Sequence, residues 1–227
     1  MKKRPLVAIP FLFVSVIVLI ITNGCKKKED SITVTDINGN IYKTVTIGSQ
    51  IWLKENLRTT KYSNGDPIPE ITSGTEWMNL TSGAYCNYNN DTGFADTYGL
   101  LYNWHAAKDP KNICPDGWHV PSDSEWTTLI DFLGGEDVAG GKLKEKGTAH
   151  WISPNTGATD SYGFTARPSG NRLAGIFNQP GYYAVWWSST EKNSTDAWII
   201  TVMNSKTRSY LEYAYKPDGF AIRCLKD

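Results

Sequence analysis

The clearest periodic pattern in the chain lies between residues 122 and 134. Its large apolar residues recur at intervals of three and four, which is one face of a helix: Trp126, Leu129, Ile130 and Leu133. Ser122 and Glu125 have the spacing of a capping box, in which each side chain satisfies a backbone N–H at a helix start. Gly134 follows where a left-handed C-cap is favourable. The pattern predicts a helix that begins after Ser122 and packs one face into a core.

Alternating patterns predict strands at both ends of the main part of the chain. β-Branched residues alternate on either side of Asn38-Gly39 within 31–45, which is typical of a hairpin. Residues 46–53 read as a further short strand entered through a glycine turn. Four β-type runs at hairpin spacing then predict a closing antiparallel sheet, namely 184–188, 197–203, 207–213 and 219–225.

A second helix and two loop regions lie between these strands. Helical spacing of apolar residues predicts a helix over 97–107, with Asp96 as its N-cap. Residues 56–90 are rich in turn formers and read as irregular connection. Residues 142–184 also read as loop, but the aromatic residues within them favour order over disorder. The predicted fold class is α+β, with two helices packed on antiparallel strands and a long loop region.

The N-terminal segment has the pattern of an export signal. Lys2, Lys3 and Arg4 precede an apolar run over 6–21, as in secretory signals. A retained membrane anchor is the alternative, although the run is shorter than the roughly 20 apolar residues that span a bilayer. Residues 22–25, Thr-Asn-Gly-Cys, resemble a bacterial lipobox in which Cys25 is lipidated, with Thr22 in place of the usual leucine.

These features predict the domain organisation of the chain. Residues 1–24 are expected to be a lipoprotein signal peptide. Residues 25–31 carry several charges and are expected to form an extended tether from a membrane surface. Residues 32–227 are expected to form a single domain, because their length suits one domain and no internal repeat divides them.

Composition and charge indicate an aromatic core and bear on whether the chain binds nucleic acid. The chain has nine Trp and twelve Tyr among 227 residues, which indicates an aromatic core. Without the three basic residues of the first 24 positions, 20 basic side chains remain against 23 acidic ones. Since nucleic-acid binding needs clustered Lys and Arg on one face, we expect no nucleic-acid partner.

The cysteines predict one disulfide. If Cys25 is lipidated, an odd number remains: Cys86, Cys114 and Cys224. A bond between Cys114 and Cys224 would close a loop of about 110 residues, which the chain-entropy model favours most. The alternative is that all three are reduced and buried as small hydrophobic residues.

The sequence proposes no catalytic, cofactor or metal site. The three histidines, His105, His119 and His150, lie far apart without partners at zinc-ligand spacing. Nucleophile-elbow and phosphate-loop motifs do not occur. Trp186 and Trp187 could form a sugar-stacking platform, but strand alternation favours placement of both in the interior.

The best candidates for ligand contact are polar and aromatic residues on the turn-rich loop region. Binding residues are frequently carried on such loops above a rigid scaffold. The candidates are Asn171, Arg172, Asn178, Gln179, Tyr182 and Tyr183.

Several motifs give the chain from Val34 to Asp227 a resemblance to a known family. They are residues 36–42 (Asp-Ile-Asn-Gly-Asn-Ile-Tyr), 55–57 (Glu-Asn-Leu), 98–104 (Tyr-Gly-Leu-Leu-Tyr-Asn-Trp), 114–121 (Cys-Pro-Asp-Gly-Trp-His-Val-Pro), 186–190 (Trp-Trp-Ser-Ser-Thr) and 219–224 (Gly-Phe-Ala-Ile-Arg-Cys). On these residues the chain resembles the Fibrobacter succinogenes major paralogous domain, which occurs in bacterial surface lipoproteins. Residues 120–126 and 219–223 are also similar, more remotely, to formylglycine-generating-type domains.

The resemblance implies a C-type-lectin-like fold in which the long loop region displays a binding surface. The paired active-site cysteines of formylglycine-generating enzymes find no matching positions here. Of the calcium-binding motifs of lectins with this fold, the chain offers only Gln179-Pro180-Gly181. Because fold alone does not carry function, no activity follows from the resemblance.

We therefore expect an outer-membrane lipoprotein at the cell surface, a non-enzymatic binding module without cofactor. Its ligand would be a polysaccharide, a glycoprotein or a surface protein. One alternative is a structural subunit of a surface complex or fibre. The other is an enzyme related to formylglycine-generating-type proteins, which would involve Cys86.

Overall fold

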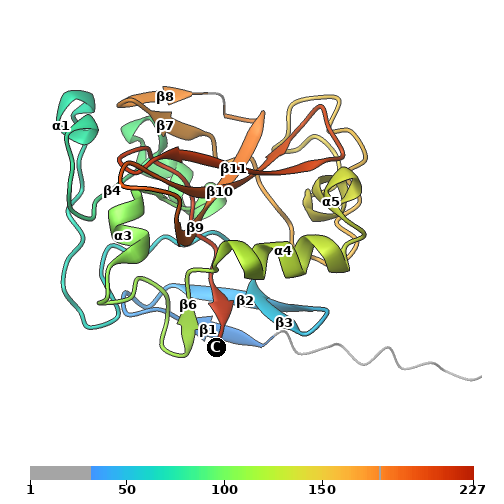
Figure 1. Ribbon diagram of the computed structural model, residues 1–227, viewed down its shortest axis with the longest axis horizontal. Coiled ribbons are helices and arrows are strands. Elements are labelled where there is room, and N and C mark those ends of the chain that lie inside the picture. The colour runs from blue at the N-terminus through green and yellow to red at the C-terminus, as the bar shows by residue number, and fades with distance from the viewer. Residues whose placement is uncertain (1–31, 179) are drawn as a thin grey trace, which may run out of the picture. The chain divides into compact units, whose positions relative to one another are not determined.

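The computed structural model describes residues 32–178 and 180–227. The predicted signal segment 1–24, the whole tether 25–31 with the lipidation site Cys25, and the ligand candidate Gln179 lie outside the described residues. Within the described ranges, no helix has both the length and the apolar character needed to cross a membrane. The fold is mixed α and β, with mostly antiparallel strands and short helices (Figure 1).

One sheet joins the two ends of the described chain. Its five strands lie in the order β1 (Thr33–Thr35), β2 (Ile41–Ile47), β3 (Gln50–Leu53), β12 (Leu225–Lys226) and β6 (Trp118–His119). The predicted hairpin at Asn38-Gly39 is confirmed, and Asp36 organises its turn by accepting from the backbone N–H groups of Asn38 and Asn40. The strand predicted within 46–53 and entered through a glycine turn is confirmed as β3, and Gly48, with its positive φ, lies in the turn between β2 and β3.

The second sheet contains three of the four predicted closing strands. β9 (Tyr183–Glu191), β10 (Asp196–Met203) and β11 (Ser209–Tyr215) pair antiparallel, with β10 in the centre. The predicted fourth strand 219–225 does not join them. Phe220 and Ala221 form isolated bridges with Tyr102 and Trp186, and only β12 continues, into the first sheet.

The helix predicted after Ser122 is confirmed as α4 (Asp123–Phe132). Both hydrogen bonds of the capping box are present, and Gly134 has a φ of +99° just beyond the helix. A following helix, α5 (Glu136–Leu143), was not predicted, since Gly140 and Gly141 lower helix propensity. A Cβ on Gly140 would lie 2.4 Å from the carbonyl oxygen of Arg208, so glycine is what permits the helix to approach the loop between β10 and β11.

The helix predicted over 97–107 is wrong. The segment contains α2 (Ala95–Tyr98), β5 (Leu101–Tyr102) and α3 (Trp104–Lys108). Gly99 ends α2 with a φ of +78°, and β5 pairs with β4 (Tyr85–Cys86). Asn103 then starts α3, because its side chain accepts from the backbone N–H of Ala106. The predicted cap Asp96 lies inside α2 instead.

The two regions predicted as loop contain further short elements. Residues 56–90 include α1 (Gly74–Met78), capped by the Ser73 side chain, together with β4. Two 3-10 turns, η1 (Tyr88–Asn90) and η2 (Thr92–Phe94), lead into α2. Residues 142–184 include the hairpin of β7 (Asn171–Leu173) and β8 (Ile176–Asn178). The expected two helices are therefore five α-helices in the described residues.

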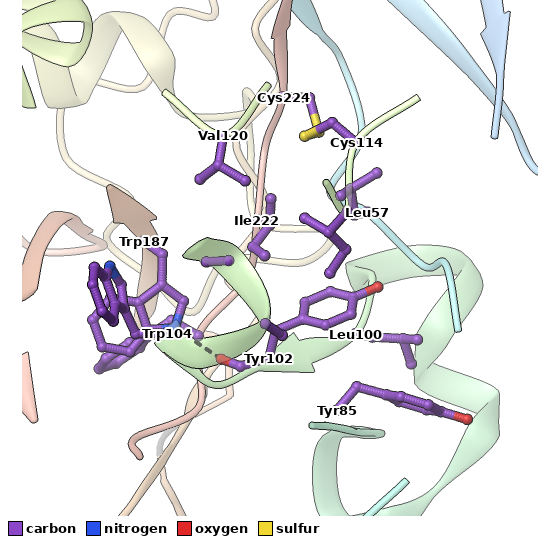
Figure 2. Packing of buried hydrophobic residues seen from close by; sticks show 14 of the residues in the cluster. Leu57, Tyr85, Leu100, Tyr102, Trp104, Cys114, Val120, Trp187, Ile222 and Cys224 are labelled. Atoms are coloured by element: carbon purple, nitrogen blue, oxygen red, sulfur yellow. Dashed lines mark hydrogen bonds between the residues drawn. A yellow bond between two sulfur atoms is a disulfide. The ribbon is translucent and has the colours of Figure 1, made fainter. Parts of the chain in front are cut away.

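The three-stranded sheet separates two aromatic cores. Trp186 and Trp187 are each 0% exposed, which confirms the interior placement of both. Because neighbouring residues of a strand point to opposite faces, they enter different clusters. Trp186 packs with Trp126 of α4 and Trp52 of β3 in one cluster. Trp187 lies in the other, where its indole donates to the carbonyl oxygen of Tyr102 at 2.8 Å (Figure 2).

The predicted disulfide between Cys114 and Cys224 is confirmed, with a sequence separation of 110 residues (Figure 2). It joins the segment before β6 to the segment before β12, at the edge of the Trp187 core. Cys86 is a free, buried cysteine in a third, smaller cluster with Trp77 and Leu101. The closing segment is thus tied covalently to the entrance of α4.

Candidate functional site

A groove of about 450 Å³ lies against one face of the three-stranded sheet. Its floor is formed by alternate residues of the strands, which share that face because strand side chains alternate. The floor residues are Tyr183, Val185, Ile199, Thr201, Met203, Glu212 and Ala214. The volume is within the range of small-molecule sites, which combine an apolar lining with a few polar groups.

The hairpin of β7 and β8 forms one wall of the groove, and the Arg172 side chain holds that hairpin in place. Arg172 is 1% exposed and its guanidinium donates to the carbonyl oxygens of Ile71 at 2.6 Å and Thr72 at 2.7 Å. It also lies between the rings of Trp77 and Phe177, at 4.6 and 4.7 Å from their centroids. Of the predicted ligand candidates, Arg172 is therefore committed to contacts inside the protein.

Asn171 presents a polar atom without a protein partner. Its side chain lines the groove and the residue is 8% exposed. Among the described residues, nothing donates to its buried Oδ1. Buried polar groups are normally hydrogen-bonded, so an unpartnered one in a groove indicates a place for a donor from a ligand. Asn178 lies opposite in the hairpin register and also lines the groove, with its Nδ2 donating to the carbonyl oxygen of Ile176.

Two carboxylates add hydrogen-bond acceptors to the groove. Asp218 accepts from the backbone N–H of Ala174 at 3.0 Å, which links it to the tip of the hairpin. Burial raises the pKa of Asp218 above its ordinary value, and the backbone N–H groups only partly offset this. Glu212 is exposed and projects from β11 on the same face. The groove thus has two carboxylate acceptors, the half-buried Asp218 and the solvent-exposed Glu212.

The tyrosines divide between the groove and the surface. Tyr183 is half-buried and lines the groove, whereas Tyr182 is 42% exposed and its carbonyl oxygen accepts from Asn204. Tyr213 lines the rim and contacts Trp198 edge to face. Three of the predicted candidates, Asn171, Asn178 and Tyr183, are therefore brought together in one site.

Sequence reasoning missed the residues that β11 and the following turn contribute, namely Glu212, Tyr213 and Asp218. They lie far along the chain from the predicted loop candidates, the last of which is Tyr183, and reach the groove only through the pairing of β11 with β10. The signal that could have found Glu212 is its position between apolar and aromatic residues of a strand, which assigns it to a face.

The histidines lie beside carboxylates that the sequence spacing did not suggest. His119 lies between Asp227 at 2.6 Å and Glu125 at 3.0 Å, and His150 lies 2.6 Å from Glu145. Burial lowers the pKa of His105. Within residues 32–178 and 180–227, no group of three or more His, Cys, Asp or Glu side chains could hold a metal ion.

Cys86 is held as a neutral thiol. Burial raises its pKa to about 12, although Arg172 nearby acts in the opposite direction. With this pKa the Cys86 sulfur is protonated at neutral pH, whereas the thiolate is the nucleophilic form of a cysteine. Its surroundings are those of a packed core residue.

The family of the chain follows from a match to a protein-family model. The model of the Fibrobacter succinogenes major domain matches residues 45–226. The chain belongs to this family. A search of curated proteins found no match, and a search of solved structures found none either. The matched region of the Fibrobacter succinogenes major domain contains the whole groove and both cysteines of the disulfide.

Proposed function

We propose that this chain is a non-enzymatic binding module whose groove takes sugar units of a surface polysaccharide or glycoprotein. The observation that carries the proposal is the buried, unpartnered Oδ1 of Asn171 in the groove wall. A sugar hydroxyl supplies the missing donor. A ligand without a hydroxyl would leave this buried acceptor without a hydrogen bond, and the missing hydrogen bond disfavours such a ligand.

The remaining lining suits the same chemistry. Sugars have hydroxyls at their edges and apolar C–H faces. Asp218 and Glu212 accept from hydroxyls, and the ring of Tyr183 offers a surface for the apolar face. Because the groove is open to solvent along the sheet, it suits an internal segment of a longer chain.

The test is a glycan array probed with the purified full chain and with three variants. Asn171→Leu removes the unpartnered acceptor, and Glu212→Gln neutralises the exposed carboxylate. Glu76→Gln, on an exposed position of α1 outside the groove, is the matched control. We expect the bound glycans to lose at least tenfold in affinity with either groove variant and to keep it with the control. A blank array, or equal loss in all three, would overturn the proposal.

A pull-down from outer-membrane extract with the same chain separates the other ligand class. A protein that is captured by the wild type and not by Asn171→Leu, from a sample treated to remove glycans, would identify a surface protein as ligand in place of a sugar. Self-association of the purified chain into large complexes would instead favour a structural subunit.

We further propose that the module is anchored to the outer membrane by lipidation of Cys25 after removal of residues 1–24. The support is the sequence pattern of the first 31 residues. Metabolic labelling with a fatty-acid analogue should mark the wild-type chain and leave Cys25→Ala unlabelled. Protease treatment of intact cells should degrade the domain if it faces outward. Labelling of both forms would contradict the anchor.

We also propose that the architecture is C-type-lectin-like. Its support is the sheet that joins both ends of the domain, the disulfide to the closing segment and the loop-rich region that precedes β9. An experimental structure superposed on domains of that fold tests it, and a different strand order in the common core would exclude it.

A further inference from the structure

A second cavity, separate from the groove, has an excess of cationic side chains in its lining. It has a volume of about 330 Å³ and lies beside β2, the segment after β3, α2 and residues 165–167. Five cationic side chains line it against two carboxylates: Lys43, Lys54, Arg58, Arg167 and Arg223, with Glu55 and Asp96. A concave site with an excess of one charge concentrates counter-ions of the opposite sign.

Arg223 forms the inner wall of this cationic pocket. The residue is 1% exposed, and its guanidinium lies over the ring of Phe164 at 4.3 Å from the centroid. Its hydrogen bonds go to neutral acceptors, the Asn56 Oδ1 at 2.8 and 3.1 Å and the carbonyl oxygen of Phe164. Among the described residues, no carboxylate lies within ion-pair distance of it.

A buried charge with neutral partners is unusual, since buried ions are normally paired with an opposite charge. Burial lowers the pKa of the Arg223 guanidinium to about 9, although the more distant carboxylates of Glu55 and Asp160 act in the opposite direction, so it is still charged at pH 7. Two of its five N–H donors are not used by the protein contacts. The side chain therefore has both a charge and donors to offer to an anion in the cavity.

The outer wall has further cations, of which Arg58 and Lys54 are little neutralised by protein carboxylates. Arg58 approaches Asp96 at 3.7 Å, but the Asp96 side chain is 96% exposed and the pair is weak. Arg167 pairs with Glu145 at 3.1 Å and donates to the carbonyl oxygen of Thr97. In the part of the chain that the structure describes, Lys54 makes no ion pair. The pocket thus favours the binding of an anion from solvent.

We propose that this cationic pocket binds the carboxylate or sulfate group of an acidic sugar. Guanidinium groups favour planar or tetrahedral oxyanions, which accept several hydrogen bonds at once. The volume of the pocket is at the lower end of the range for small-molecule sites, so it holds more than an inorganic ion and less than a chain of sugars. The Thr97 side chain in the lining suits a hydroxyl of a sugar ring.

Calorimetric titration of the full chain tests the proposal, with glucuronate, inorganic sulfate and glucose as separate probes at low ionic strength. Glucuronate should bind saturably and more tightly than sulfate, and glucose should not compete with it. Its affinity should fall as sodium chloride is raised, because the contact is between charges. If sulfate binds at least as tightly as glucuronate, the pocket is a site for a free ion and the proposal is overturned.

Matched variants place the binding in this pocket. The double variant Lys54→Gln and Arg58→Gln removes two cations from the lining and leaves the buried Arg223 intact. The control, Lys108→Gln and Lys226→Gln, removes the same charge from exposed positions elsewhere. Thermal melts first establish that both variants are folded. Glucuronate affinity should fall at least tenfold in the first variant and less than twofold in the control. Equal loss in both would show a non-specific charge effect and overturn the proposal.

This test is distinct from the test of the groove. Asn171→Leu should leave glucuronate binding in the cationic pocket unchanged. The two sites can thus fail or succeed separately, since the residues of one do not line the other.

Discussion

The Nζ of Lys144 lies 2.8 Å from the carbonyl oxygen of Met203. Three more backbone carbonyl oxygens surround it, those of Thr156 at 2.9 Å, Asn204 at 3.5 Å and Lys206 at 2.8 Å. Lys144 itself is 0% exposed, and burial lowers its pKa to about 8. The ammonium group therefore serves as an internal cation that fastens the segment after α5 to the loop after β10.

Replacing this internal cation should weaken the fold strongly. Lys144→Met keeps most of the side-chain volume but leaves buried carbonyl oxygens without a donor. We expect a loss of about 3 kcal/mol or more in the free energy of unfolding, measured by urea titration. Lys146→Met, at a nearby exposed position, should change it by less than about 0.5 kcal/mol. A Lys144 variant as stable as the wild type would show that the carbonyl cage contributes nothing.

Reduction of the disulfide should release a long loop. Cys114 and Cys224 are separated by 110 residues, and closing a loop of that length destabilises the unfolded chain by about 5 kcal/mol in the chain-entropy model. We expect the urea midpoint of the wild type to fall when a reductant is added. The double variant Cys114→Ser and Cys224→Ser should show the lower midpoint with or without reductant. A wild-type midpoint that does not respond to reductant would contradict the prediction.

Gly99 should tolerate no side chain. It has a φ of +78°, and an added Cβ would lie 2.6 Å from the Cβ of Asn56 and 2.7 Å from the carbonyl oxygen of Leu57. Gly117 is a matched control, because its φ is +77° and an added Cβ meets nothing within 4 Å. Gly117→Ala should cost about 1 kcal/mol from backbone strain alone. Gly99→Ala should cost at least about 2 kcal/mol more in urea unfolding, and equal effects would rule out the steric contribution.

The pairing of His119 with Asp227 and Glu125 should make stability depend on pH. Burial lowers the pKa of His119, but its hydrogen bonds to the two carboxylates outweigh burial and raise the pKa above 6.5. Its contribution is therefore complete below pH 6.5 and is lost as the pH rises through the folded pKa. Burial raises the pKa of Glu125, but Ser122 and His119 outweigh burial and lower it below 4.5. That contribution is complete above pH 4.5 and is lost as the pH falls through the folded pKa.

The measurement is the free energy of unfolding of the wild type and of His119→Gln as a function of pH. The difference between the two proteins isolates the imidazole from other titrating groups. We expect it to be largest between pH 4.5 and 6.5 and to shrink on the alkaline side. A difference that grows with pH would reverse the sign and refute the assignment.

The parts of the fold that follow from local chemistry could be predicted from the sequence. The capping box of α4, the Asn38-Gly39 hairpin and the three strands β9 to β11 depend on neighbouring residues, and their patterns are strong. The helix expected over 97–107 failed, because apolar spacing did not reveal the positive φ of Gly99. Helix α5 was missed since its glycines allow close contacts with distant backbone, Gly140 with Arg208 and Gly141 with Gly157.

Only the part of the candidate groove that comes from the loop region could be predicted from the sequence. Asn171, Asn178 and Tyr183 lie in the same loop region, so turn composition pointed to them. Glu212 and Asp218 join them through strand pairing, which is a long-range property. The cationic pocket was not predicted at all, because Lys54, Arg167 and Arg223 come from three separate parts of the chain.

The adjacent tryptophans of β9, Trp186 and Trp187, affect how the domain unfolds. One strand supplies a central side chain to each of two interiors, so neither interior can lose its packing while the other keeps it. Melting should therefore follow a single transition in the tryptophan fluorescence of the chain. A destabilising mutation on either side of the sheet weakens the whole domain, including the walls of both cavities.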